Sequence, residues 1–464
     1  MYIVYLICSI LLLIEEYVRL SVIGFDNSYL SEEAFIGLFL IASVGYLYKS
    51  RKNNLFCFET FFLAFSFLII FFDYLVLSAT PDTGLIGSLF GRYSEPVRIK
   101  TFYVSILSIF VFLLGSYVSD MKSTKSSVQY SEETFLSNRL SVYDLRFISK
   151  VLTTITLLYF GYLFAIGYIS SWFRYGSDSS SYTNTKVVYL TVLCLSSTVV
   201  QFAQYAGHTF SSVWGFIKQI DKFYLCVIGI VTFLLLISGN RNEALYVILP
   251  MLACYSILVK SITNREFFFL FFAGFCIMVF IGLTRQTSVG KGLDDSFGFG
   301  LFEFTRDFGY ANIDSMYLVE FTDNKGVMGF NLGIINLLSA IPFLGGICIP
   351  LFGIEESVRS STATTDGMGI HHTGLGTSLI GDTYYTGGII FTLLYFYLLG
   401  ILMSYLHNKF HRSKSINIYL LVIYSFMISN AVYCLRSEWY ASFRYIGFSI
   451  IVLFTSKLLL NKRS

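Results

Sequence analysis

The stretch LFCFETFFLAFSFLIIFFDYLVLS (residues 55–78) decides the fold, because it is apolar at nearly every position. A helix needs about 20 mostly apolar residues to cross the hydrocarbon core of a bilayer, and this stretch is long enough. The whole chain has the same character: of its 464 residues, 55% are hydrophobic and 13% are charged, with a mean hydropathy of +0.67. This composition excludes a soluble globular protein and is typical of a polytopic membrane protein.

Similar apolar runs occur along the whole sequence, separated by short polar joints. Besides 55–78, we predict spans at 2–17, 33–48, 101–118, 148–170, 185–205, 223–238, 243–260, 266–284, 387–406, 416–434 and 444–458. The sequence therefore predicts an all-α polytopic membrane protein with about 12 transmembrane helices, within a range of about 11–14. We expect residues 1–464 to form a single integral membrane domain.

The basic residues predict which joints lie in the cytoplasm, because cytoplasmic loops are enriched in lysine and arginine. More than half of the 32 basic residues fall in one set of joints, at 49–52, 119–150, 218–222, 260–265, 409–414 and 457–463. We therefore expect both termini to be cytoplasmic. The joints at 79–100, 171–184, 239–242, 285–386 and 435–443 should then face outward.

The outward loop 285–386 is far longer than an ordinary connection, so we expect it to be functional and to cover the active site. Within it, GIINLLSAIPFLGGICIPLFGI (333–354) is apolar but contains two prolines and a Gly–Gly pair. This segment is a re-entrant hairpin, an interfacial segment or a pair of spans. A pair of spans would leave the predicted topology unchanged.

Several charged residues fall near the predicted outer ends of spans: Arg241, Arg285, Arg306, Arg436, Glu438 and Arg444. Charge near hydrocarbon is costly and usually has a partner or a function. Any single arginine here can instead extend its side chain to lipid headgroups. Because the guanidinium group matches phosphate oxygens in bidentate geometry, several arginines on one face favour an anionic ligand such as a lipid diphosphate.

Two adjacent histidines, His371 and His372, stand in GMGIHHTGLGTSLIGDTYYTGG (367–388) and are the only histidines predicted to lie outside. A histidine can accept the proton of an attacking hydroxyl near neutral pH. Apolar residues at near-helical spacing predict a short amphipathic helix over 373–386 at the membrane interface. That helix would carry Asp382, which is a second candidate base, an orienter for a histidine, or a solvated loop carboxylate.

The sequence offers no pattern for a cofactor or a nucleic-acid partner. The cysteines show no paired spacing, so neither a disulfide framework nor a zinc site is indicated. Two adjacent histidines rarely converge on one ion, and we predict no metal at the site. The net charge of +3 is too small for a nucleic-acid surface, and no nucleotide-binding loop is found.

In layout, the chain resembles the O-antigen polymerase (Wzy-type) family of oligosaccharide repeat-unit polymerases. The resemblance rests on SGNRNEAL (238–245), LTRQ (283–286), FTRD (304–307), GLGTSLIGDTYYTGGIIF (374–391) and LRSEWYASFR (435–444). It implies membership of the GT-C-like superfamily, which also contains the O-antigen ligases. The Arg-x10-Gly spacing proposed for some polymerases is absent after Arg241, Arg285 and Arg306.

The resemblance implies a metal-independent glycosyltransferase of the bacterial inner membrane with its active site facing the periplasm. It would transfer a growing glycan from undecaprenyl diphosphate to the non-reducing end of a new lipid-linked repeat unit. Arg241 and Arg285 would hold the diphosphate, as would Arg436 and Arg444, and His372 or His371 would serve as base. Arg306 and Glu438 are further candidates.

Donor and acceptor would both be undecaprenyl-diphosphate-linked oligosaccharides. Membrane lipids, a chain-length regulator and a flippase of the same pathway are the other expected partners. Two alternatives stay open. One is an O-antigen ligase that transfers glycan to lipid A core, and the other is a flippase or transporter of lipid-linked oligosaccharide.

Overall fold

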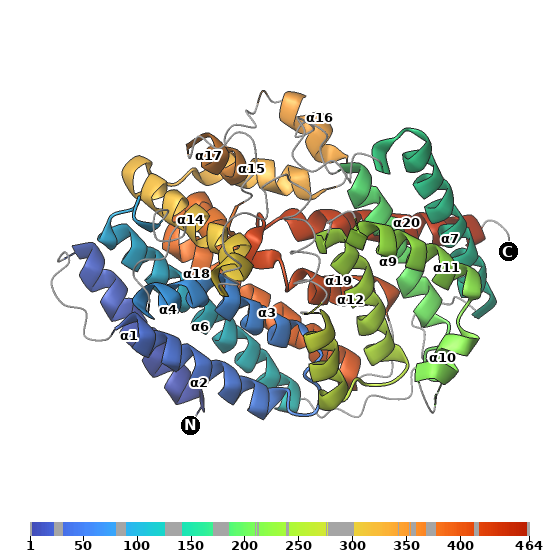
Figure 1. Cartoon of the computed structure of the whole chain (residues 1–464), viewed down its shortest axis with the longest axis horizontal. Coiled ribbons are helices and arrows are strands. Elements are labelled where there is room, and N and C mark those ends of the chain that lie inside the picture. The colour runs from blue at the N-terminus through green and yellow to red at the C-terminus, as the bar shows by residue number, and fades with distance from the viewer. Residues whose placement is uncertain are drawn as a thin grey trace, which may run out of the picture.

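The computed structural model describes residues 2–22, 31–79, 90–125, 142–169, 185–208, 210, 213–237, 241–274, 276, 301–341, 343–351, 353, 359–367, 377–412 and 417–461. Within these residues the chain is helical, without strands, so the predicted all-α class is confirmed for them. The helices pack side by side, and α15, α16 and α17 lie together along one side of the molecule (Figure 1).

The stretch that opened the sequence analysis forms one helical rod, made of α3 (Phe58–Ser66), η1 (Phe67–Phe71) and α4 (Phe72–Ala79). Its middle section, η1, is a π-helix, a form in which wider turns disturb the regular hydrogen-bond ladder. The Asn312 side chain donates to the carbonyls of Ile69 (3.0 Å) and Ile70 (3.1 Å), and to Oδ2 of Asp73 (3.1 Å). A helix of the long loop therefore hydrogen-bonds directly to a membrane span.

The centre of the bundle is the pair α6 (Glu95–Lys125) and α18 (Leu379–Arg412). A Cβ added at Gly115 would lie 2.2 Å from the carbonyl oxygen of Tyr397, and one added at Gly400 would lie 2.2 Å from that of Phe112. Only glycine permits so close an approach of two helix backbones. These two positions let α6 and α18 pack tightly.

The other long helices surround this pair. On one side α1 (Tyr2–Val22) and α2 (Glu32–Ser50) pack against α6. On the other, α9 (Thr185–Ala203) is the hub for α7 (Val142–Ala165), α12 (Arg241–Leu258), α19 (Ile418–Asn430) and α20 (Ala441–Asn461). The pair α10 (Val213–Gln219) and α11 (Lys222–Ile237) completes this half.

Six helices in the described residues are long and apolar enough to cross a membrane, or seven if the α10–α11 pair, bent by 108°, is one span. The six are Phe58–Leu77, Glu95–Ser123, Val142–Ala165, Lys186–Ala203, Leu379–His411 and Ala441–Leu458. Shorter apolar helices occupy two further predicted spans, at Asn242–Leu258 and Ile418–Asn430. The chain is thus a multi-pass membrane protein, and a total of about 12 spans stays a prediction.

A buried charged network joins the ends of α2, α6 and α18. The Arg51 guanidinium contacts Oδ1 and Oδ2 of Asp120 at 3.1 Å each and Oε1 of Glu59 at 2.5 Å. Asp120 Oδ1 also accepts from Ser404 and Asn408 of α18, at 2.6 Å each. The joints that carry these residues were predicted to share the cytoplasmic side, and the structure places them together.

At the other end of the bundle, Tyr384 Oη donates to Asp323 Oδ1 (3.0 Å), and Lys100 pairs with Asp323 Oδ2 (2.7 Å). These contacts join the first turns of α6 and α18 to the last turn of α14 (Leu301–Lys325). The long loop also contains α15 (Gly329–Ala340), α16 (Leu344–Leu351) and α17 (Ser360–Gly367). Because α14 packs against α6, α18 and η1, this part of the loop belongs to the helix bundle.

The helix predicted over 373–386 begins at Leu379 and ends at a kink. Gly387 and Gly388 interrupt α18 with non-helical backbone, and Gly388 has a φ of +67°, a conformation that favours glycine. Every residue from 377 to 386 is buried. The prediction of an amphipathic helix at the interface was therefore wrong in its setting, because α14 and the turn before α20 cover the side that was expected to be polar.

Candidate functional site

Asp382 lies at the centre of the candidate site, in the short helical segment before the α18 kink. It is 1% exposed, and its Oδ2 accepts a 2.9 Å hydrogen bond from the backbone N–H of Trp439. Its Oδ1 has no hydrogen-bond partner among the described residues. A buried carboxylate with one oxygen held and the other unpaired is costly to maintain, which marks it as a candidate for function.

Glu438 lies in the turn before α20, next to Trp439. Its Oε1 accepts a 2.8 Å hydrogen bond from the Ser361 hydroxyl of α17. Ser360, the preceding residue, interacts with the Asp382 carboxylate, and its Oγ accepts a 3.1 Å hydrogen bond from the Thr377 hydroxyl. The short helix α17 thus lies against both carboxylates, with Ser361 hydrogen-bonded to Glu438 and Ser360 beside Asp382.

Asp314, on α14, is a second buried carboxylate near this cluster, and sequence reasoning did not single it out. Ser315 Oγ lies 2.5 Å from Ser378 Oγ, so α14 touches α18 one turn before Asp382. Asp314 is 1% exposed, its Oδ1 has no partner among the described residues, and burial raises its pKa to about 8 while nearby Arg436 opposes the rise. No spacing in the sequence signals Asp314, because its importance comes from α14 packing inside the bundle.

Arg359 is a second residue that the sequence did not reveal. Its guanidinium donates to Ser339 Oγ of α15 at 3.3 Å and interacts electrostatically with Tyr440, which also faces Glu438. Together with Arg436, it supplies cations to a cluster that would otherwise carry carboxylates alone. Arginines beside carboxylates can hold an anionic ligand and keep the site close to neutral.

Aromatic rings form one wall of the site around Trp439. Its ring lies 5.9 Å from that of Phe391, 6.0 Å from those of Tyr395 and Tyr440, and 6.3 Å from that of Phe443. The Trp439 indole N–H has no partner among the described residues. Such rings pack well against the apolar faces of sugars while offering polar edges for hydrogen bonds.

The predicted site residues fall into three groups. The first group lies in the cluster described above and consists of Asp382, Glu438 and Arg436. Arg444 lies on α20 and Arg241 begins α12; these two helices meet where the rings of Tyr246 and Tyr445 lie 5.3 Å apart. Arg306 lies in α14, and for Arg241 and Arg306 only the backbone is described. His371, His372 and Arg285 lie outside the described residues.

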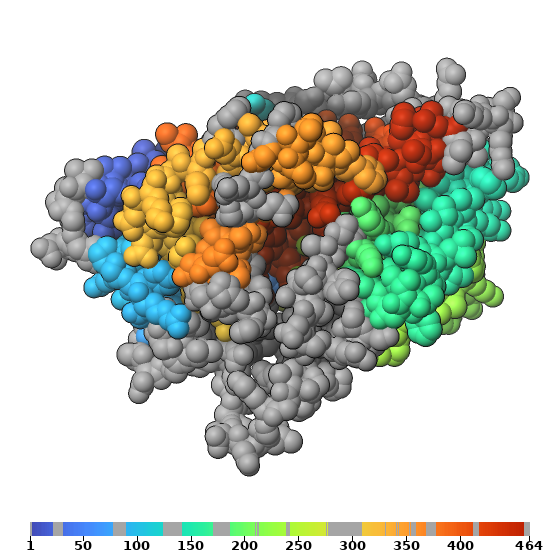
Figure 2. All heavy atoms as spheres, turned by 90° about the horizontal axis from the view of Figure 1, so that it is seen from above, coloured from blue at the N-terminus to red at the C-terminus, as the bar shows by residue number. Residues whose placement is uncertain are grey.

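Seen from above, the yellow and orange segments of α14 to α17 and the red segments near the C-terminus share one face (Figure 2). Red atoms are visible deep between the orange and green segments, where this face is hollowed. The carboxylates of α14 and α18 and the turn before α20 come from these coloured segments. The described part of the long loop therefore contributes residues to the candidate site, and its role as a cover of the active site stays a prediction.

Two other features of the described residues lie away from Asp382. One is a group of possible metal-ligand atoms that lie within 4.8 Å of one another, although the sequence indicated no metal site. These atoms belong to Cys57, Glu59 and His407. His407 follows Asp382 by 25 residues of α18, so roughly 35 Å separate them along the helix. Because Arg51 already pairs with Glu59, we interpret this group as part of the network that joins the helices.

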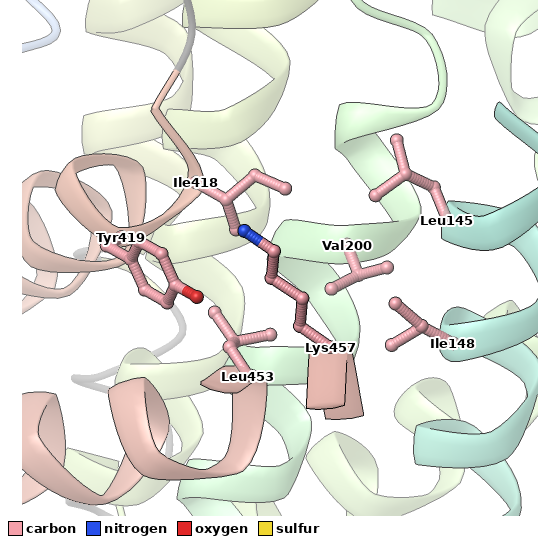
Figure 3. Close-up of a pocket in the computed structure, with 7 residues that line it drawn as sticks. All are labelled: Leu145, Ile148, Val200, Ile418, Tyr419, Leu453 and Lys457. Atoms are coloured by element: carbon pink, nitrogen blue, oxygen red, sulfur yellow. The ribbon is translucent and has the colours of Figure 1, made fainter. Parts of the chain in front are cut away.

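An apolar cavity lies between α7, α9, α19 and α20. It is lined by Leu145, Ile148, Val200, Ile418, Tyr419, Leu453 and Lys457, and the Lys457 amine extends past the apolar groups toward Ile418 (Figure 3). It contains no carboxylate and lies near the end of α20. The cavity is consistent with helix packing and a snorkelling lysine rather than with chemistry.

The cluster around Asp382 has the parts that glycosyl transfer needs. A buried carboxylate can accept the proton of a sugar hydroxyl or orient another base, and arginines can stabilise a phosphate leaving group. Comparison with known proteins points the same way: a family model described as O-antigen polysaccharide polymerase Wzy matches residues 1–463. No curated protein and no solved structure matches the chain.

Proposed function

Because this chain belongs to the O-antigen polysaccharide polymerase Wzy family, we propose that it polymerises lipid-linked O-antigen repeat units at the periplasmic face of the inner membrane. The growing glycan would move from undecaprenyl diphosphate to the non-reducing end of a new lipid-linked repeat unit. Membership of the family supports polymerisation of O-antigen as the activity, without fixing the substrates. The donor, the acceptor and the membrane face are our proposal.

The observation that carries this proposal furthest is the buried carboxylate of Asp382, held by Trp439 beside Glu438, with Arg436 acting on Asp314 of the adjoining α14. It joins the end of the long loop to the turn before the last span, as the predicted outward topology requires. We assign Asp382 the role of a base or of an orienter for His371 or His372.

In the proposed step, the bond between the reducing-end sugar of the growing glycan and the diphosphate oxygen breaks. A hydroxyl of the acceptor's terminal sugar forms the new glycosidic bond and gives its proton to the base. Undecaprenyl diphosphate leaves with its electron pair, and Arg436, Arg241, Arg285 and Arg444 would stabilise the added charge, with Arg306 as a further candidate. The energy comes from the donor bond, so the step needs neither a nucleotide nor a metal.

A deletion strain tests the function directly. Loss of a polymerase leaves lipopolysaccharide that carries a single repeat unit, and complementation restores the ladder. Absence of any attached O-antigen would instead indicate a ligase, and accumulation of repeat units on the cytoplasmic side would indicate a flippase. The expected partners, a chain-length regulator and a flippase, should then remain dispensable for chain extension by the purified protein.

The proposed site is tested with the purified protein and a synthetic undecaprenyl-diphosphate repeat unit. Arg285→Ala and His372→Ala should each reduce chain extension by orders of magnitude while the protein stays folded. If both variants extend chains at near-normal rates, the assignment of the site is wrong. Chain extension should also persist in EDTA, and strong inhibition would show that a metal takes part.

A further inference from the structure

We infer that the hairpin formed by α15 and α16 (residues 329–351) lies in the outer leaflet of the membrane, with lipid acyl chains as its partner. This inference concerns a lipid-contact surface and does not depend on the reaction proposed above. It selects among the three possibilities that the sequence left open for this apolar segment.

The composition of the hairpin suits hydrocarbon. Residues 329–353 contain no aspartate, glutamate, lysine, arginine or histidine. Their polar side chains are limited to Asn331, Asn336 and Ser339, and Asn336 is fully buried. A loop of this length that is exposed to water would carry charged residues.

Apart from Asn331 near the start of α15, the most exposed side chains of the hairpin are large and apolar. The exposed fractions are 60% for Leu337, 52% for Ile341, 63% for Phe343, 64% for Ile347 and 75% for Leu351. Scattered apolar residues on a surface are ordinary, but five in one short hairpin form a continuous apolar surface. Such a surface is stable against lipid and unstable against water.

The hairpin is anchored to a membrane span. The rings of Phe343 and Phe448 lie 5.1 Å apart, and Phe448 is about two turns into α20, counted from Ala441. Phe343 adopts a φ of +67°, which is unusual for a bulky residue, and the contact with Phe448 helps to hold it there. The apolar surface of the hairpin is therefore continuous with α20, whose Phe443, Ile451 and Phe454 are also exposed.

Two backbone hydrogen bonds close the turn between α15 and α16, which reduces the number of unpaired polar groups that a membrane would meet. The N–H of Ile341 donates to the carbonyl of Leu338 at 3.3 Å, and that of Leu344 donates to the carbonyl of Ile341 at 3.2 Å. Non-helical backbone is tolerated at membrane depth where it is packed against protein, here against α20. At the end of α15, Ser339 Oγ accepts a 3.3 Å hydrogen bond from Arg359, the residue before α17, so the turn of the hairpin is also held to the protein.

Nitroxide accessibility in proteoliposomes tests this inference. In a cysteine-free version of the full chain, Ile347→Cys and Leu351→Cys would each carry a spin label. We expect oxygen, which concentrates in hydrocarbon, to relax both labels more than a polar nickel chelate does. Leu398→Cys on α18 is the hydrocarbon control, and Asp366→Cys on α17 is the aqueous control, because both side chains are exposed.

Two results would overturn the inference. A greater effect of the nickel chelate at both positions would place the hairpin in water, and protection from both reagents would place it under another protein or a second copy. If the cysteine-free chain does not fold, Leu351→Trp in the otherwise native chain replaces the labels. The fluorescence that it adds to that of the three native tryptophans should be quenched by lipids with brominated acyl chains, whereas the fluorescence added by Asp366→Trp should not. Quenching that is equal for the two variants would also contradict the inference.

Discussion

The backbone N–H of Trp439 donates a 2.9 Å hydrogen bond to Oδ2 of Asp382, joining two segments that are 57 residues apart in the sequence. One partner lies before the kink of α18 and the other in the turn before α20. The bond fixes one oxygen of a buried carboxylate, and the other oxygen has no hydrogen-bond partner among the described residues. It is the contact on which the proposed base or orienter depends.

Asp382→Asn should reduce chain extension by about 10²–10⁴-fold, the usual contribution of general base catalysis or of its correct orientation. The amide has the same shape and can still accept from Trp439, so the variant should fold. Chain extension by purified protein and thermal unfolding in detergent are the measurements. Asp366→Asn, which changes an exposed carboxylate of α17, is the matched control and should behave like the native protein. Activity of Asp382→Asn within a few-fold of native would remove Asp382 from the mechanism.

Asp314→Asn should change the dependence of stability on pH. Burial raises the pKa of Asp314 from 3.8 to about 8, so the folded state binds this proton more tightly than the unfolded state does. The contribution of protonated Asp314 to the free energy of unfolding is complete below the unfolded pKa and is lost as the pH rises through about 8. The uncharged amide avoids this loss. The variant should therefore come closest to the native protein near pH 4, and its advantage in unfolding temperature should grow as the pH rises to about 8.

Unfolding curves for both proteins across this pH range decide the point. If Asp314 is instead ionised and paired with Arg436, the variant would be less stable than the native protein at pH 8. Identical curves at every pH would show that Asp314 does not titrate in this window.

Gly388→Ala should destabilise the protein by about 1–3 kcal/mol, because its φ of +67° and ψ of −164° lie in a region that residues other than glycine rarely adopt. The nearest atom to an added Cβ is Val327 Cγ1 at 3.5 Å, so conformation and not a clash sets the cost. Because the kink positions Asp382, chain extension should fall as well. Thermal unfolding and chain extension are measured on the same preparations.

Gly161→Ala provides the matched control within a helix. An added Cβ there meets no atom within 4 Å and Gly161 has no left-handed φ. Its effect should be neutral or stabilising by about 0.5–1 kcal/mol. Equal effects of the two substitutions would show that the kink does not require glycine.

Arg51→Met should destabilise the protein by about 3–5 kcal/mol, because it leaves Glu59 and Asp120 buried without their cation. The triple variant that also carries Glu59→Gln and Asp120→Asn should recover much of this loss. Lys52→Met changes the exposed neighbouring cation and should have little effect. Thermal unfolding of the four proteins is the test. No recovery in the triple variant would mean that the network stabilises through shape and not through charge.

The sequence by itself determined the class of protein and several of its parts. Runs such as 55–78 are too apolar and too long for a soluble protein, and this property survives any detail of packing. It also indicated that Asp382, Arg436 and Glu438 lie near helix ends on one face, since each follows or precedes an apolar run. The family resemblance, which rested on short motifs, is confirmed over residues 1–463.

Only the tertiary structure decided which of these residues meet, and in what environment. Local spacing predicted a half-exposed helix around Asp382, but α14 packs over it. Gly381 permits this packing, because a Cβ added at Gly381 would lie only 3.0 Å from the Cα of Ser315. That packing buries the carboxylate and brings in Asp314, 68 residues earlier in the chain. Periodicity reports which face of a helix is apolar, whereas burial of a polar group depends on a partner helix that no local pattern encodes.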